Sequence, residues 1–146
     1  MSERFEKEAP GQAFGGSPLD YKNRAYTFLD VLCNDRDFPR AHSYLDPNCV
    51  LIHADNPPVR GADEFISGWQ QNLKQMPDYH KNILDIVVEP GDEHPGVAKV
   101  WVYSQISGIT KDKLTDSIDM MHFSASGLFL DSKDVQRTVG RPDAAG

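Results

Sequence analysis

The chain has 146 residues, enough for one domain with an enclosed core and a single pocket. It is 39% hydrophobic and 25% charged, as is usual for globular proteins. Its formal net charge of −7 disfavours binding to nucleic acid and to anionic membranes. No segment approaches the roughly 20 apolar residues that span a bilayer, so we expect neither nucleic acid nor membrane as a partner.

The amino-terminal segment 1–16 is rich in charge, glycine and proline, which predicts a flexible arm. It contains acidic residues and no apolar run, so it has the pattern of neither a signal peptide nor a transit sequence. The two cysteines, Cys33 and Cys49, lie far apart and outside any Cys-x-x-Cys spacing. Together these features predict a cytoplasmic protein with reduced, buried thiols.

Helical patterns occupy the first half of the chain. The segment "SPLD" at 17–20 is a helix start with a capping pair and an early proline, and apolar residues recur at helical spacing in each predicted helix. The helices are expected at about 17–33, 37–45 and 62–76, with one strand of apolar and β-branched residues at 49–54.

The second half of the chain alternates with a period of two residues, which indicates strands. These strands are expected at 79–89, 96–108, 114–124 and 128–136. The order predicts one α+β domain over 17–138, followed by a flexible tail at 139–146. We expect a cone-shaped barrel in which a strongly curved, mostly antiparallel sheet wraps around three helices, with a small-molecule pocket inside.

Asp119 is the leading candidate for a functional residue. On its strand it shares a face with Ser117, Met121 and Phe123, because side chains two residues apart point the same way. Secluding a carboxylate on an apolar face is expensive. Either that face is open to solvent, or it lines a cavity in which the carboxylate exchanges protons.

Further candidates could partner Asp119. Tyr103 shares a face with Trp101 and could donate a hydrogen bond to a substrate carbonyl, or it could be an ordinary core aromatic. His53 or His80 could supply an acid or base, although either could equally be structural. His122 alternates with Asp119 and is expected on the opposite face.

The candidate residues fall into two sets, one catalytic and one substrate-binding. The catalytic candidates are Asp119, His53, His80, Tyr103 and Asp131. The substrate-binding candidates are Arg40, Trp101, Met121, Phe123, Phe129 and Trp69. Asp131 is placed on a face with Phe129 and Lys133 whose direction the sequence leaves open, and Arg40 is placed at the mouth of the cone or on the surface.

Signatures of cofactor chemistry are missing from the sequence. It contains no HExxH, GxGxxG, GxxxxGK or GxSxG pattern, and His53 with Asp55 is too small a set for a metal site. We therefore expect no cofactor and no metal, which leaves acid/base chemistry on an apolar substrate.

Four segments resemble the nuclear transport factor 2-like superfamily, and within it the SnoaL-like proteins related to polyketide cyclases. They are "YTFLDVLCNDRDFPRAHSYLDPNCVLIHADNPPVRGADEFISGW", "MPDYHKNILDIVVEPGDE", "VAKVWVYSQISG" and "SIDMMHFSASGLFL". The resemblance covers roughly 18–137. It implies a conical barrel, usually a homodimer, around a pocket for a small apolar molecule.

The resemblance also implies a role for one residue, because the acid/base aspartate of SnoaL-like cyclases matches Asp119. The chain departs from those cyclases at Gln105 and Ile106, where their central-strand histidine falls, and in a hairpin that reads Ser-Gly in place of Asp-Gly.

Two main hypotheses follow. The first is a cofactor-independent isomerase, cyclase or dehydratase acting on a small apolar metabolite such as a polyketide or terpenoid. In it Asp119 moves a proton while His53 or His80, with Tyr103, stabilises the developing anion. The alternative is a non-catalytic small-molecule-binding or dimerisation module with a filled cone. An epoxide hydrolase would need an arginine on the central strands, and none is present there.

Overall fold

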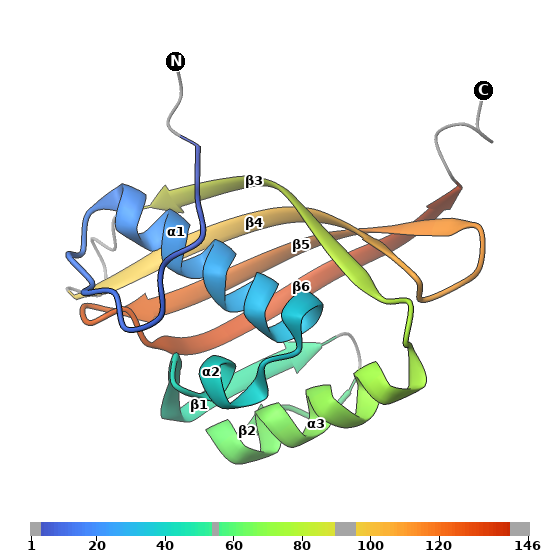
Figure 1. The fold of residues 1–146 in the computed structure, drawn as a ribbon, viewed down its shortest axis with the longest axis horizontal. Coiled ribbons are helices and arrows are strands. Elements are labelled where there is room, and N and C mark those ends of the chain that lie inside the picture. The colour runs from blue at the N-terminus through green and yellow to red at the C-terminus, as the bar shows by residue number, and fades with distance from the viewer. Residues whose placement is uncertain (1–3, 54–55, 90–95, 141–146) are drawn as a thin grey trace.

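The computed structural model describes residues 4–53, 56–89 and 96–140. Six strands form one curved sheet with three helices packed on one side of it (Figure 1). The helical elements are α1 (Pro18–Leu29), the π-helical turn η1 (Asp30–Asp35), α2 (Phe38–His42) and α3 (Ala62–Gln75). The strands are β1 (Leu45–His53), β2 (Val59–Arg60), β3 (His80–Glu89), β4 (Val97–Ser107), β5 (Lys113–Ser124) and β6 (Phe129–Gly140). The predicted α+β fold with a curved sheet is confirmed.

The strand order is β2-β1-β6-β5-β4-β3, and the sheet does not close on itself. All neighbours are antiparallel except β1 and β6, which run parallel. The short strand β2 pairs with β1 at the sheet edge, and the sequence analysis did not anticipate it. Long strands β3–β6 therefore supply the curved wall against which the helices lie.

Helix α1 begins with the predicted capping box. The Ser17 hydroxyl accepts from the Asp20 N–H at 3.1 Å, and the Asp20 carboxylate accepts from the Ser17 N–H at 3.1 Å. The helix then widens into η1, which ends at Arg36 in a left-handed conformation with φ of 57°. This π-helical turn replaces the regular helix that was expected up to residue 33.

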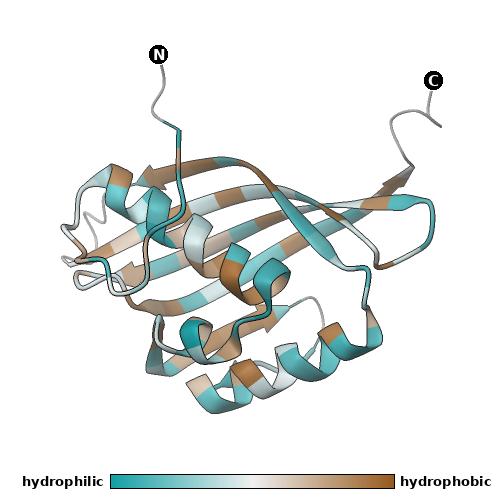
Figure 2. Cartoon of the chain, viewed as in Figure 1, coloured by the Kyte–Doolittle hydropathy of each residue, from teal (hydrophilic) through white to brown (hydrophobic). Residues whose placement is uncertain are grey.

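The core lies between the helices and the inward face of the sheet. Buried and more exposed residues alternate along β4 and β5, so that one face of the sheet points into the core, while hydrophobic and hydrophilic residues both occur along each strand (Figure 2). Phe28, Phe65, Phe123 and Phe129 form an aromatic cluster, with the Phe28 and Phe129 centroids 5.3 Å apart. This cluster fills one end of the space under the sheet.

Residues 5–14 of the amino-terminal segment contact α1. Glu8 and Arg24 form a buried ion pair with a 2.8 Å Nε–Oε1 distance. The Arg24 guanidinium also donates to the Gly127 carbonyl and stacks on the Phe14 ring. Arg24 thus compensates the charge of Glu8, a residue 16 positions earlier in the chain.

Three other expectations concern the carboxyl-terminal end of the domain, the cysteines and membrane-spanning helices. Strand β6 runs to Gly140, two residues past the expected domain end, and the rest of the predicted tail lies outside the described residues. Cys33 and Cys49 are both buried with free thiols. Burial raises the pKa of the Cys33 thiol to about 12, which makes it a poor nucleophile. No described helix is long and apolar enough to cross a membrane.

Candidate active site

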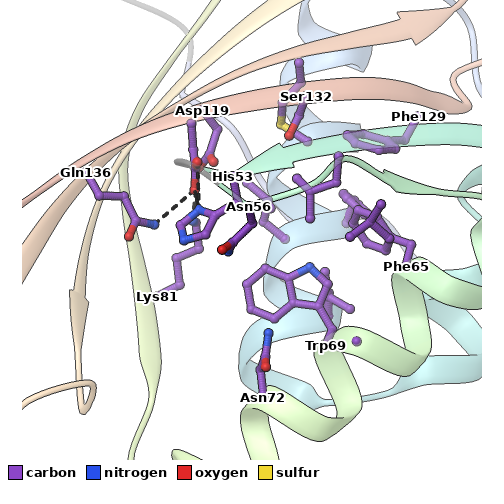
Figure 3. A pocket seen from close by; sticks show the side chains of 18 of the residues that line it. His53, Asn56, Phe65, Trp69, Asn72, Lys81, Asp119, Phe129, Ser132 and Gln136 are labelled. Atoms are coloured by element: carbon purple, nitrogen blue, oxygen red, sulfur yellow. Dashed lines mark hydrogen bonds and ion pairs between the residues drawn. The ribbon is translucent and has the colours of Figure 1, made fainter.

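A cavity of about 320 Å³ lies between the inward face of the sheet and helices α1 and α3. One side is apolar, formed by Phe28, Phe65, Trp69, Met121 and Phe129. The other side carries ionisable and amide groups, formed by His53, Lys81, Asp119, Asp134 and Gln136. Figure 3 shows Asp119, Lys81, His53 and Gln136 together, with Trp69, Phe65 and Phe129 across from them. Such a division between an apolar body and a few convergent polar groups is typical of small-molecule sites.

Lys81 and Asp119 form a buried ion pair at the polar side. The Lys81 Nζ atom lies 3.0 Å from Asp119 Oδ2, and the two side chains are 4% and 11% exposed. Burial acts most strongly and lowers the pKa of the Lys81 ammonium, but Asp119 and the other acidic groups nearby together outweigh it and hold the pKa above its usual value. No donor among the described residues is aligned for a hydrogen bond with Asp119 Oδ2, so the ammonium alone compensates that oxygen.

A second pair lies beside the first. The His53 Nδ1 atom lies 2.6 Å and 2.8 Å from the two Asp134 carboxylate oxygens. Gln136 donates to the Asp134 Oδ2 atom at 3.2 Å. Because a carboxylate only accepts, His53 donates from Nδ1, and its Nε2 atom is left to act as an acceptor. Burial raises the pKa of the Asp134 carboxyl, and the hydrogen bond from His53 opposes that rise in part.

Strand pairing brings the two ionic pairs together. Asp119 on β5 and Asp134 on β6 are directly opposite each other in the antiparallel register, and both line the cavity. Lys81 reaches the same place from β3, and His53 reaches it from the end of β1. The site therefore joins one cation, two carboxylates and one imidazole from four strands.

Comparison with known proteins assigns the chain to a family. The family model of the SnoaL-like polyketide cyclases matches residues 23–107. The chain belongs to the SnoaL-like polyketide cyclase family. A protein named "probable cyclase otaY" from Aspergillus niger is 33% identical over 121 residues, which is 83% of this chain and 95% of that protein.

Two solved structures share the fold at low sequence identity. An NTF2-like protein of unknown function from Pseudomonas putida has a TM-score of 0.68 at 10% identity, over 82% of this chain and 88% of the other. A hexachlorocyclohexane dehydrochlorinase from Novosphingobium barchaimii has a TM-score of 0.67 at 9% identity, over 80% and 85%. At these identities the two structures support the SnoaL-like fold alone.

Five residues expected at the site do line the cavity of this SnoaL-like domain. They are Asp119, His53, Trp69, Met121 and Phe129. Asp119 is 8% exposed and points inward together with Ser117 and Met121, so the cavity alternative for its face holds and the solvent alternative does not. His122, expected on the opposite face, does lie there.

The central-strand candidates Trp101 and Tyr103 do not line the cavity. In the register of β4 and β5, Asp119 pairs with Val102, and directly opposite residues share a face. Trp101 and Tyr103 therefore point to the outer face, where Tyr103 donates to Asp116 at 3.2 Å. The expectation failed because the inner face of β4 carries small and medium-sized side chains such as Val100 and Val102, while its large aromatic residues lie on the outer face, so that side-chain size did not identify the inner face.

His80 and Asp131 are also displaced from the site. His80 is exposed, because on β3 it is the neighbouring Lys81 that points inward. Asp131 faces outward, where its carboxylate lies 2.6 Å from the His122 Nδ1 atom. A β-bulge between Phe129 and Asp131 is the reason, since an extra residue there moves Phe129 and Asp131 onto different faces.

Arg40 and Phe123 have structural surroundings. Arg40 donates to the Tyr44 hydroxyl and to the Glu8 carbonyl, so it holds the amino-terminal arm and does not reach the cavity mouth. Phe123 is completely buried and packs on Phe129 behind the cavity wall. Its inward direction was predicted correctly, but Phe129 separates it from the open space.

Lys81, Asp134 and Gln136 were missed by the sequence analysis. Lys81 lies between Tyr79 and Ile83 at a spacing of two, the same sign of an inward charge that identified Asp119. Asp134 and Gln136 share a face with Ser132, but this becomes readable only when the bulge is known. Among the described residues, no three histidine, cysteine or carboxylate side chains are grouped so as to hold a metal ion.

Proposed function

We propose that this protein is a cofactor-independent acid/base enzyme, a cyclase, isomerase or dehydratase, acting on a small and largely apolar metabolite such as a polyketide or terpenoid. The observation that carries the proposal is the His53–Asp134 pair, which lies beside the Lys81–Asp119 pair at the polar side of an apolar cavity. An oriented imidazole next to a buried ammonium suits removal of a proton from a carbon next to a carbonyl.

In the proposed reaction, His53 Nε2 removes the proton while Asp134 holds the ring through Nδ1. The electron pair of the broken C–H bond moves to the carbonyl oxygen, and the Lys81 ammonium stabilises the resulting enolate. Return of the proton from His53 to another carbon gives an isomer. Attack of the enolate carbon on a second carbonyl closes a ring, and the new alkoxide takes the proton from His53. Expulsion of a β-hydroxyl, which takes the same proton and leaves as water, gives a dehydrated product. Asp119 serves as the counter-ion that keeps Lys81 charged and in place, instead of moving the proton itself.

The relatives support the cyclase reading. The Aspergillus niger protein carries the name of a probable cyclase and matches along nearly its whole length. The apolar wall of aromatic side chains accommodates a flat hydrocarbon body. The volume of the cavity lies at the lower end of those found for small-molecule sites. A ligand of that kind would place an enolisable carbonyl at Lys81 and its ring against Trp69.

Proton abstraction can be measured without the natural substrate. We choose 2-tetralone in D₂O, an apolar ketone, and follow deuterium exchange at its α-carbon by proton NMR. The protein is expected to accelerate exchange, and His53→Gln is expected to lower the rate by about 10²- to 10⁴-fold. His122→Gln is the matched control, because His122 makes the same kind of 2.6 Å contact with a carboxylate on the outer face.

Two results of this assay would contradict the proposal. One is exchange no faster than in buffer, and the other is equal loss in the His53→Gln and His122→Gln variants. The non-catalytic alternative predicts the first result together with perturbation of the Trp69 and Met121 signals by bound tetralone. Open space beside Asp119 argues against the filled cone that this alternative invoked.

The proposal includes a second copy of the chain as partner, through the outer face of the sheet. Exposed apolar side chains lie there in adjacent strands, with Ile118 46% exposed and Val135 75% exposed. These two residues pair directly across β5 and β6, and Tyr103 pairs with Ile118 across β4. An apolar row of this kind on a self-complementary face supports a two-fold dimer.

A further inference from the structure

The side chain of Asn34 binds the backbone of Lys81 on both sides. Its Oδ1 atom accepts from the Lys81 N–H at 2.8 Å, and its Nδ2 atom donates to the Lys81 carbonyl at 2.9 Å. The amide thus takes the place that a neighbouring strand would occupy. A third bond, from Nδ2 to Asp30 Oδ1 at 2.8 Å, fixes the amide in this orientation.

The contact with Asn34 lies on the edge of β3 that faces away from β4. β3 is the outermost strand of the sheet (Figure 1), so every second residue turns its N–H and C=O away from β4 and towards a free edge. Lys81 is such a residue, and Asn34 satisfies both of its groups. A bulge follows between Ile83 and Asp85, so the pairing with β4 alone leaves the register of the strand start weakly held.

A slip of one residue at this point would change the site completely. Side chains alternate along a strand, so the shift would turn Lys81 outward and bring His80 or Asn82 under the sheet. Asp119 would then lose the ammonium that compensates it. The position of the strand start therefore decides whether the cavity contains a cation.

The C-cap of the π-helical turn η1, which contains Asn34, binds the chain just before Lys81. Arg36, at its end, donates to the Tyr79 carbonyl at 3.2 Å and to the Leu73 carbonyl at 3.1 Å. Arg36 thus holds the segment that leads from α3 into β3 up to Tyr79, and Asn34 holds Lys81 itself. A π-helical turn within a longer helix is uncommon and frequently occurs at functional sites.

We propose that Asn34 is a positioning residue for Lys81, which it holds in the register that presents the ammonium to Asp119 and to the cavity. The inference rests on the proposed function for the importance of Lys81, but the contact itself is independent of any reaction. Asn34 touches no part of the cavity and acts only through the backbone of Lys81.

The test measures how fast Lys81 reacts with sulfosuccinimidyl acetate in the full chain, by mass spectrometry of lysine peptides. Asn34→Leu keeps the side-chain size and removes both backbone bonds, and Lys81 is expected to react about tenfold faster than in the wild type. Asn34→Asp can still accept from the Lys81 N–H but cannot donate to its carbonyl, so an intermediate rate is expected. This second variant also serves if the leucine variant does not fold.

Ser17→Ala is the matched control, because it removes the cap of α1 and weakens the fold without a contact to β3. A structural loss alone would accelerate Lys81 equally in the control and in the Asn34 variants, and that outcome would overturn the inference. Faster labelling confined to the Asn34 variants supports it. Labelling needs no turnover, so an inactive protein in the tetralone assay would remove the proposed reaction without affecting this result.

Discussion

Replacing Asp119 by asparagine would leave the Lys81 ammonium inside the protein without its anion. The two side chains are 4% and 11% exposed, so water screens the pair little. Removing one partner of a buried ion pair costs about 3–5 kcal/mol, which is a large part of the about 5–15 kcal/mol that stabilises a typical domain. We expect a loss of that size for Asp119→Asn, and a similar one for Lys81→Met.

The double variant separates an ion pair from two independent contributions. Lys81→Met combined with Asp119→Leu removes both charges and fills the space with apolar atoms, so it should be more stable than Lys81→Met alone or Asp119→Leu alone. Urea unfolding at pH 7, followed by tryptophan fluorescence, gives the four free energies of a double-mutant cycle. We expect a coupling energy of about 3 kcal/mol. Lys133→Met, at an exposed position on β6, should change stability by less than about 0.5 kcal/mol.

The Asp119→Asn variant should also reverse the direction in which the contribution of Lys81 to stability changes with pH. In the wild type the folded-state pKa of Lys81 lies above 10.5, so its contribution is complete below pH 10.5 and is lost as pH rises through the folded pKa. In Asp119→Asn burial acts on Lys81 without its main opposing charge, so its folded pKa should fall below the unfolded value, and stability should increase as pH rises from 7 towards 10. Additive single losses below about 1 kcal/mol, with no such increase, would refute the buried pair.

Three further predictions concern other parts of the fold. Phe129→Ala should lower the free energy of unfolding by about 3–5 kcal/mol in urea titrations, because it empties the centre of the aromatic cluster. Glu8→Gln should cost about 3 kcal/mol by the same measurement, since it leaves buried Arg24 without its anion, whereas the exposed Glu6→Gln should stay within about 0.5 kcal/mol. Ile118→Asp should give a monomer in sedimentation velocity while the wild type sediments as a dimer, and a monomeric wild type would contradict the proposed interface.

Local patterns carried most of the fold. The capping pair at Ser17 and the helical spacing after it located α1, and the period of two located each long strand within a few residues. Asp119 was found for the same reason, because its neighbours at a spacing of two are small or apolar and the face could be read from one strand alone. Such signals need no knowledge of what lies across the sheet.

The remainder of the site depends on pairings between distant segments. The bulge before Asp131 changes which alternate residues of β6 point inward. No local sequence pattern predicts the bulge, so Asp131 was chosen as a candidate and Asp134 was not. Tyr103 and Val102 are equally plausible inward residues until the register with Asp119 is known. Likewise, the pairing of Glu8 with Arg24 joins two segments that no local pattern connects.

The balance of charge in the cavity supports the roles that we propose for His53 as the base and Lys81 as the group that stabilises the enolate. With a neutral imidazole, the two carboxylates of Asp119 and Asp134 exceed the single cation of Lys81 by one charge. A proton that His53 takes from the substrate removes this excess. The negative charge left on the substrate then develops beside Lys81, and His53 and Lys81 compensate opposite ends of the same transferred charge. An isolated aspartate in an apolar cone would lack the second compensation, which is why the register of Lys81 matters as much as the presence of Asp119.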